Sequence, residues 1–406
     1  MVKRARPGNG WSGRDINEKH RVSTPLELFF DLTFATSLAV VSQQMSRLLV
    51  HGDFFAALLS FAISMLSICW AWMNYSWFAS AYDSDDLSFR LATMIHMVGV
   101  IVLSLGLPRL FQSTAEGVRL DNSVMVLGYV IMRLAMIFLW IRAAQFDHAR
   151  RSTLLANAAV VFFAQVLWII LILWMPPLRE ALIYLAVLGC VEFVSPAAFY
   201  RSWGAPPWHA HHIAERYGLL VIIALGECVY GTVSMVGAVV DQRGWTAEPI
   251  LVGTACVGLA FGCWWLYFQR SFGDFLKARR DSAYGWGYLH ILVFASIVAM
   301  GAGLQVSGEF LKGKSVFTDL ATLAFNAAAV CAYISSVFVV RNLSILRWSR
   351  IDLILWGGSM LAAVTSLAML KWGFSLPACL AVLSLAPFVV ISGREAFRLL
   401  GIKLSQ

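Results

Sequence analysis

Long runs of apolar residues, separated by short polar segments, set the pattern of this chain. Each run is about as long as the roughly 20 residues that a helix needs to cross a bilayer core of about 30 Å. The runs are too long, and alternate too little, for the strands of a membrane β-barrel. We therefore expect twelve transmembrane helices, near residues 24–48, 54–80, 91–110, 122–142, 152–175, 180–200, 213–239, 248–269, 284–306, 316–340, 351–370 and 374–392.

The composition supports the same fold class. Hydrophobic residues make up 59% of the 406 residues and charged residues only 13%, whereas a soluble domain has roughly a quarter of its residues charged. No polar stretch is long enough for a soluble domain of ordinary size. We predict an all-α integral membrane protein whose main partner is the lipid bilayer.

The distribution of basic residues predicts the orientation of the helices, because short loops rich in Lys and Arg stay in the cytoplasm. With the N-terminus inside, one of the 31 Lys and Arg residues falls within a span, and most of the rest belong to the inner loops and tails. The residue inside a span is Arg133, and the outer loops hold Arg47, Arg109, Arg119, Arg179, Arg243, Lys312, Lys314 and Lys371. We predict that both termini are cytoplasmic.

Other features of the composition narrow the classes of function. The net charge of +8 comes without a basic stripe interleaved with aromatic residues, so nucleic acid is not an expected partner. The seven cysteines lie in apolar runs without CxxC pairs or metal-ligand spacing, which favours buried thiols over disulfides. No pattern for a bound cofactor is present. The first 22 residues are basic and lack the apolar core of a cleavable signal, so we interpret them as a retained flexible tail.

An internal similarity suggests that the chain is duplicated. The run Cys69-Trp70-Ala71-Trp72 resembles Cys263-Trp264-Trp265-Leu266, and the same offset pairs Phe78 with Phe272, Ser88 with Ser282 and His96 with His290. An offset of six helices keeps the orientation, so the repeats are parallel. We predict four parts: a cytoplasmic tail (1–22), two tandem six-helix halves (23–202 and 203–394) and a short cytoplasmic tail (395–406).

Two motifs, one at the start of each predicted half, resemble a known family. They are Pro25-Leu26-Glu27-Leu28-Phe29-Phe30-Asp31-Leu32-Thr33-Phe34 and His212-Ile213-Ala214-Glu215-Arg216-Tyr217-Gly218-Leu219, the second running into Val221-Ile222-Ile223-Ala224-Leu225-Gly226-Glu227. Together they are similar to the signatures of the bacterial low temperature requirement protein A (LtrA) family, although the family more often has a larger aliphatic residue than Thr33. The resemblance implies a multi-pass protein of the bacterial cytoplasmic membrane, and it implies no mechanism.

Charged and titratable residues inside the predicted spans are the candidate functional groups. Each such residue costs several kcal/mol unless it is paired or lines a polar cavity. Near mid-depth we expect Arg133, Glu192 and Glu227, and toward the cytoplasmic side Glu27, Asp31, His96, Glu215 and His290. Glu27 and Asp31 are four residues apart and share a helix face. Buried ion pairs that only hold helices together are the alternative interpretation.

Two further patterns receive a structural interpretation. His211 and Glu215 are four residues apart and are a weak candidate for a metal site, but a solvated helix start is the simpler interpretation. Seven tryptophans near the inner helix ends are expected to form an interfacial aromatic belt: Trp70, Trp72, Trp77, Trp208, Trp264, Trp265 and Trp286.

These features favour a secondary transporter or ion pathway, coupled to protons, with its site between the two halves and helices 1 and 7 as the predicted lining. Its substrate is a small solute or an ion that the sequence does not identify. A membrane-embedded enzyme acting on a lipid or lipid-linked substrate at the cytoplasmic face is the alternative. No HExxH, GxSxG or P-loop motif supports that alternative. A scaffold or assembly factor is a third hypothesis that no single residue favours.

Overall fold

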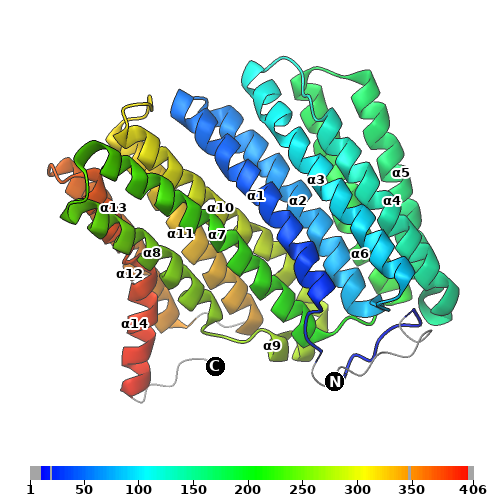
Figure 1. Ribbon diagram of the computed structural model, residues 1–406. Helices are drawn as coiled ribbons and strands as arrows, with labels where there is room; N and C mark the ends of the chain where they lie inside the picture. The colour runs from blue at the N-terminus through cyan, green and yellow to red at the C-terminus, as the bar shows by residue number, and fades with distance from the viewer. Residues whose placement is uncertain (1–10, 19–20, 346–348, 401–406) are drawn as a thin grey trace. The chain divides into compact units, whose positions relative to one another are not determined.

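The structure, a computed structural model, describes residues 11–18, 21–345 and 349–400, and of residues 343–345 it describes the backbone alone. Over those ranges the chain is helical, with a single β-bridge between Arg119 and Pro177 and no strand (Figure 1). Twelve helical segments in this described part are long and apolar enough to cross a membrane. The predicted fold class, an all-helical protein with twelve spans, is confirmed to that extent.

The helices follow one another with short connections. They are α1 (Pro25–His51), α2 (Phe54–Tyr82), α3 (Leu87–Glu116), α4 (Ser123–Phe146), η1 (His148–Arg150), α5 (Arg151–Trp174), α6 (Leu178–Trp203), α7 (Ala210–Arg243), α8 (Ala247–Phe268), α9 (Gly273–Ala278), η2 (Arg280–Ser282), α10 (Ala283–Leu311), α11 (Asp319–Ile345), α12 (Arg350–Lys371), α13 (Leu376–Leu383) and α14 (Ala386–Leu399).

Two of the predicted segments differ in detail from the structure. The last span, expected as one helix near 374–392, is broken into α13 and α14 and continues to Leu399. Pro387 stands at the first turn of α14, where its missing N–H and fixed φ suit a helix start but not a helix interior. The loop predicted near 270–283 contains the short helices α9 and η2.

The chain forms two compact units, each made of discontinuous segments. The first comprises Met1–Val40, Leu59–Arg216 and Phe272–Arg280, and the second comprises Val41–Leu58, Tyr217–Ser271 and Asp281–Gln406. The predicted tandem halves and the cytoplasmic position of both termini stay predictions.

Close helix packing in the first unit depends on glycine. A Cβ on Gly106 of α3 would lie 2.2 Å from the backbone nitrogen of Met125 in α4, and a Cβ on Gly128 would lie 2.3 Å from that of Leu103. Helices in lipid gain no hydrophobic driving force from each other, so such small residues hold them together by letting backbones touch.

The second unit uses the same device between α7 and α10. A Cβ on Gly301 would lie 2.7 Å from the Cβ of Glu227, and one on Gly231 would lie 2.7 Å from the carbonyl oxygen of Gly301. This contact fixes the part of α7 that carries Glu227 directly against α10.

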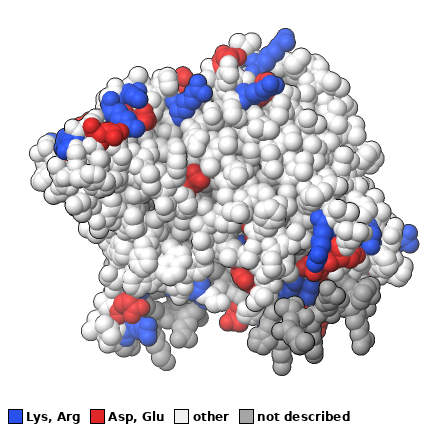
Figure 2. Space-filling model, viewed as in Figure 1, with Lys and Arg blue, Asp and Glu red and all other residues white. Residues whose placement is uncertain are grey.

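Charged side chains are distributed as expected for helices in a bilayer. In the view of Figure 2, lysine, arginine, aspartate and glutamate gather near the helix ends, and the surface between them is almost entirely uncharged. Hydrocarbon excludes unpaired charge at several kcal/mol per group, so this pattern agrees with the spans assigned from length and hydropathy.

Candidate functional site

The beginning of α1 is fixed by a reciprocal cap. Thr24 donates its backbone N–H to Glu27 Oε2 at 2.8 Å, and Glu27 donates its backbone N–H to Thr24 Oγ1 at 3.2 Å. This is the capping box that a Thr followed three residues later by Glu predicts. The cap sets the direction of the Glu27 carboxylate, which is fully buried.

Glu27 and Asp31 of α1 meet His212 and Arg216 at the start of α7. Arg216 binds Asp31 with two hydrogen bonds, Nη2 to Oδ1 at 2.5 Å and Nε to Oδ2 at 3.0 Å, and its Nη1 lies 3.1 Å from Glu27 Oε1. His212 Nε2 lies 3.2 Å from Glu27 Oε2. All four side chains are 0% exposed, and each pair is four residues apart on its own helix, so two helix faces match.

Two further charged groups complete this cluster, which we call the ion cluster, and an indole donates a hydrogen bond to it. The guanidinium of Arg21 lies 3.8 Å from Glu27 Oε1 and 3.6 Å from Asp83 Oδ2, just after α2. Trp72 of α2 donates its indole N–H to Asp31 Oδ1 at 2.7 Å. The ion cluster therefore contains the carboxyls of Glu27, Asp31 and Asp83, the guanidiniums of Arg21 and Arg216, and the imidazole of His212.

The ion cluster has more carboxyl groups than guanidinium groups. Three carboxylates face two guanidinium groups, so with His212 neutral the buried charge is negative, and one bound proton would balance it. Burial, together with the neighbouring Glu27 carboxylate, raises the pKa of Asp83 from 3.8 to about 6, and Arg21 opposes that rise. Asp83 is thus a position in the cluster at which a proton can balance the charge.

The end of the first unit where α1 begins and α2 ends is called the tail end here, because residues 11–18 lie against it. Arg14 donates its backbone N–H to the carbonyl of Ala81 at 2.9 Å, and Trp11 donates its indole N–H to Asp86 at 2.6 Å. Hydrogen bonds from Trp11 and Phe89 are the main favourable interactions that lower the pKa of Asp86. The N-terminal segment is therefore anchored to the helix ends.

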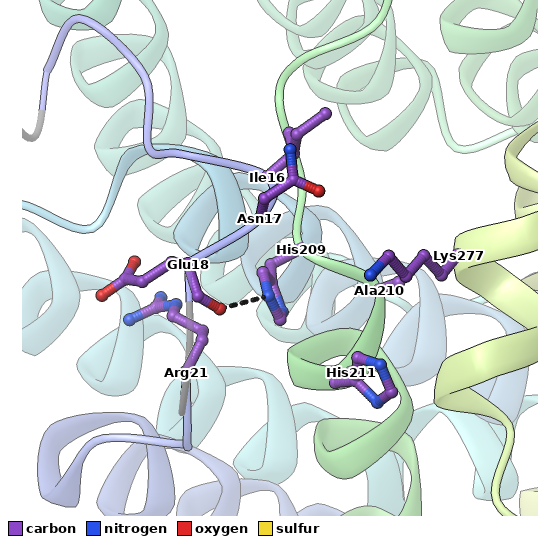
Figure 3. Close-up of a pocket in the computed structure, with 8 residues that line it drawn as sticks. All are labelled: Ile16, Asn17, Glu18, Arg21, His209, Ala210, His211 and Lys277. Atoms are coloured by element: carbon purple, nitrogen blue, oxygen red, sulfur yellow. Dashed lines mark hydrogen bonds between the residues drawn. The ribbon is translucent and has the colours of Figure 1, made fainter.

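A cavity of about 410 Å³ opens at the tail end beside the ion cluster, and Figure 3 shows its lining. The ring of His209 lies 3.0 Å from the backbone carbonyl of Glu18, and its Nδ1 accepts the backbone N–H of His212 at 3.3 Å. The ring hydrogen is therefore on Nε2 and donates to Glu18. Burial lowers the pKa of His209, which agrees with this neutral form. Arg21 lines the same cavity, so the cavity reaches a member of the ion cluster.

A second buried ion pair lies deeper in the first unit. Arg133 of α4 donates to Glu192 of α6 at 3.0 Å and to the hydroxyl of Tyr129 at 2.6 Å. Glu192 also accepts the indole N–H groups of Trp70 at 3.0 Å and Trp168 at 2.8 Å. The carboxylate of Glu192 thus accepts hydrogen bonds from side chains of three other helices, α2, α4 and α5.

An apolar cavity of about 590 Å³ leads to this pair from the opposite end of the helices. Its lining begins near Leu59 and Asn122, close to the starts of α2 and α4, and reaches Trp70, Trp168 and Glu192. Within this cavity Glu192 is the charged lining residue. The span that carries Glu192 is also the least buried of the twelve.

Hydroxyl and imidazole groups continue from the ion cluster between α1, α2 and α3. The Tyr75 hydroxyl bonds to Thr93 at 2.8 Å, and Ser37 bonds to Ser104 at 2.7 Å. His96 lies on α3 between Thr93 and Ser104 and is 0% exposed. Near the opposite end, Ser60 of α2 bonds to Thr114 of α3. We call the ion cluster with these groups the polar column, and all of its residues belong to the first unit.

The remaining sequence candidates lie outside the polar column. In the second unit, Glu227 is buried on α7, and a hydrogen bond joins its carboxyl to Ser42. His290 bonds at both ring nitrogens, to the Trp286 carbonyl at 2.8 Å and to the Tyr267 hydroxyl at 3.0 Å. In the first unit, Glu215 is half-buried and accepts the backbone N–H of Ser23 at 3.3 Å.

The weak metal candidate gains no geometric support. His211 Nε2 lies 3.4 Å from Asp274 Oδ1, and both side chains are exposed. Across the described residues, no three His, Cys, Asp or Glu side chains gather closely enough to hold a metal ion.

Two expectations from the sequence are wrong. Arg133 is not the sole arginine inside a span, because Arg216 is buried in α7 and Arg394 in α14, where Arg394 pairs with Asp352 at 2.5 Å. The tryptophans do not all form an interfacial belt: Trp264 and Trp265 are exposed, whereas five are buried, and two of these donate to buried carboxylates. The five are Trp70, Trp72, Trp77, Trp208 and Trp286.

The sequence interpretation missed four members of the ion cluster, namely Arg21, Asp83, His212 and Arg216. A signal for two of them is present, because His212 and Arg216 repeat the four-residue spacing of Glu27 and Asp31 with a basic character. The family motifs contain both pairs, so opposite charges at equal spacing could have predicted the contact. Arg21 and Asp83 follow no such pattern, since they lie outside the spans.

Comparison with known proteins gives two similarities. The family model described as "Bacterial low temperature requirement A protein (LtrA)" matches residues 22–387. An uncharacterized protein of Rhizobium meliloti (strain 1021) is 25% identical over 317 residues, which cover 73% of this chain and 72% of that protein. The family match covers most of the chain, including every residue of the polar column except Arg21. The protein therefore belongs to the bacterial low temperature requirement A (LtrA) family of membrane proteins.

Proposed function

We propose that this protein moves an ion across the membrane through the polar column of the first unit, and that a proton takes part in that movement. The observation that carries the proposal is the unbalanced ion cluster, in which three buried carboxyls face two arginines and a histidine. Intramembrane ionisable groups are expensive and mark ion or proton routes by default.

A cluster that only braced helices would be expected to balance its charges, because an unpaired buried charge is strongly destabilising. The third carboxyl carries a negative charge that a proton or another cation at the tail end would neutralise. The cavity beside Arg21 supports access to this position from outside the bilayer.

Beyond the ion cluster, the rest of the proposed route consists of uncharged side chains that can form hydrogen bonds. Along α3, His96 lies about 14 Å and Ser104 about 26 Å from the helix start, at 1.5 Å per residue. Thr114, bonded to Ser60, lies near the far end of the same helix. Polar side chains therefore occur at successive depths from one end of α3 to the other.

This proposal keeps the pair of helices that the sequence prediction named. The prediction put the site between the two halves, with helices 1 and 7 as its lining, and the contacts between the starts of α1 and α7 belong to the first compact unit. Whether those repeats exist, and which end of the helices faces the cytoplasm, stay predictions.

Purified protein in liposomes tests the proposal. Liposomes with an imposed proton or potassium gradient should lose it faster with the protein than without, and the variant Asp31→Asn/Arg216→Gln should abolish that flux. The double change removes one negative and one positive charge together, which leaves the net charge of the ion cluster unchanged.

The matched control is Asp352→Asn/Arg394→Gln, which removes a buried aspartate–arginine pair of the same 2.5 Å contact from the second unit. It should keep the flux of the unchanged protein. Absence of flux in the unchanged protein, or equal flux in both double variants, would contradict the proposal. A membrane-embedded enzyme would instead convert a lipid in detergent without any gradient.

A further inference from the structure

His96 differs from the other members of the polar column in its hydrogen bonding. Its ring is 0% exposed, and among the described residues neither Nδ1 nor Nε2 has a hydrogen-bond partner. Neutral imidazole has one donor and one acceptor nitrogen, and both are costly to bury unbonded. Buried groups of this kind normally bond to ordered water.

The surroundings of His96 come from three other helices. The ring of Phe30 from α1 lies 5.1 Å away and that of Tyr75 from α2 lies 5.3 Å away, both edge to face. Arg133 of α4 is the charged group that acts electrostatically on the ring. On α3 itself, Thr93 is one turn away and is already bonded to Tyr75.

These surroundings suit a proton better than a metal cation. A dehydrated alkali cation needs a ring of oxygen ligands, as the carbonyl filters of potassium channels provide. Here the faces beside the imidazole are aromatic, and the nearest hydroxyls, those of Tyr75 and Thr93, bond to each other. A proton needs only successive hydrogen bonds, and an imidazole can accept it at one nitrogen and release it from the other.

We infer that His96 is a proton relay, and that the ion carried by the polar column is the proton; this inference rests on the function proposed above. A protonated water on the tail-end side gives a proton to one ring nitrogen, so an O–H bond breaks, an N–H bond forms and neutral water remains. The other ring nitrogen then gives its proton to water or a hydroxyl on the Ser37–Ser104 side, so an N–H bond breaks and an O–H bond forms. One proton enters and one leaves, and nothing is oxidised or reduced.

The test compares two histidines in liposomes, with proton flux and potassium flux measured in parallel. His96→Asn should lower proton flux roughly a hundredfold or more, in the range of general acid–base effects. His290→Asn changes a histidine that is also 0% exposed but has both nitrogens bonded in the second unit, outside the polar column. It should retain proton flux.

A chemical rescue separates a relay from a purely structural role. Proton flux lost in His96→Ala should return in part when imidazole is added to both sides of the liposomes, and added imidazole should not restore flux to Asp31→Asn/Arg216→Gln. Thermal unfolding in detergent identifies which variants are folded, and His96→Gln replaces any His96 variant that is not.

The outcomes distinguish this inference from the proposed function. Full proton flux in folded His96→Asn, or potassium flux without proton flux in the unchanged protein, overturns the relay and leaves an ion pathway in place. No flux of either ion in the unchanged protein overturns the proposed function itself.

Discussion

His96 and His290 occupy equivalent positions in the sequence similarity, yet the two units use them differently. Both rings are 0% exposed and both contact aromatic rings. His290 bonds at both nitrogens, whereas His96 bonds at neither among the described residues. The same residue type can therefore stabilise a helix contact through both ring nitrogens in one unit and keep its hydrogen-bonding capacity free in the other.

The buried aspartate–arginine pairs of the two units also differ in the charges that surround them. Arg216 and Asp31 belong to a cluster with more carboxyls than arginines. Arg394 and Asp352 have the opposite surroundings, because Arg270 and Arg341 also interact electrostatically with Asp352. The first unit is thus built to hold an added positive charge, and the second is not.

The largest effect is expected from removing one arginine of each pair. Arg216→Gln should cost about 3–5 kcal/mol of the free energy of unfolding, because it leaves buried carboxylates with a single guanidinium. Arg394→Gln should cost less, since Arg270 and Arg341 remain near Asp352. Thermal unfolding of the purified variants in detergent measures both, and equal losses would contradict the difference between the two clusters.

Asp83 provides a pH test of the acidic surplus. Its pKa is raised from 3.8 to about 6, so the folded protein binds the proton more tightly than the unfolded chain does. The stabilisation is fully present below pH 3.8 and is lost as the pH rises through 6, by about 3 kcal/mol in all. Unfolding measured between pH 4.5 and 7.5 should lose this slope in Asp83→Asn, while an unchanged slope would assign it to another group.

Trp70 and Trp264 are the next pair, since the sequence similarity aligns them. Trp70 is 5% exposed and donates to the Glu192 carboxylate, whereas Trp264 is 39% exposed. Trp70→Phe should cost about 1.5–3 kcal/mol, the range for a hydrogen bond to a charged group. Trp264→Phe should change the free energy of unfolding little. The comparison fails if the two variants unfold at the same temperature.

The smallest effect is expected from replacing the two histidines by leucine. His290→Leu should cost about 1 kcal/mol more than His96→Leu, because it removes the hydrogen bonds to Tyr267 and Trp286. The variant at His290 is thus expected to lose more stability but keep proton flux, whereas the variant at His96 is expected to lose less stability but also lose proton flux. If His96→Leu is instead the less stable variant, the contrast between the two histidines is wrong, because His96 then makes the larger contribution to stability.

Much of the fold could be predicted from the sequence, because a bilayer demands about 20 consecutive apolar residues for each helix. The break at Pro387 was missed because hydropathy measures burial and not backbone continuity. The buried tryptophans were placed in a belt for a related reason. Composition near a helix end does not reveal whether an indole faces lipid or a carboxylate on another helix, as Trp70 and Trp72 do.

The candidate site was predictable in part. Glu27, Asp31, Arg133 and Glu192 were found because ionisable residues are conspicuous in apolar runs. Their partners were harder to predict, since pairing across the chain depends on which helix faces meet. Arg133 and Glu192 are 59 residues apart, and Asp31 and Arg216 are 185 apart.

The sequence by itself determined the helical class, the number of spans and the family, since these follow from local apolar length and from motifs within single helices. The tertiary structure alone decided that Arg216 joins Glu27 to Asp31, that Glu192 ends a cavity, and that His96 differs from His290. The physical reason is that a buried polar group is defined by the partners around it. Those partners come from other helices, and only packing sets their distance and number.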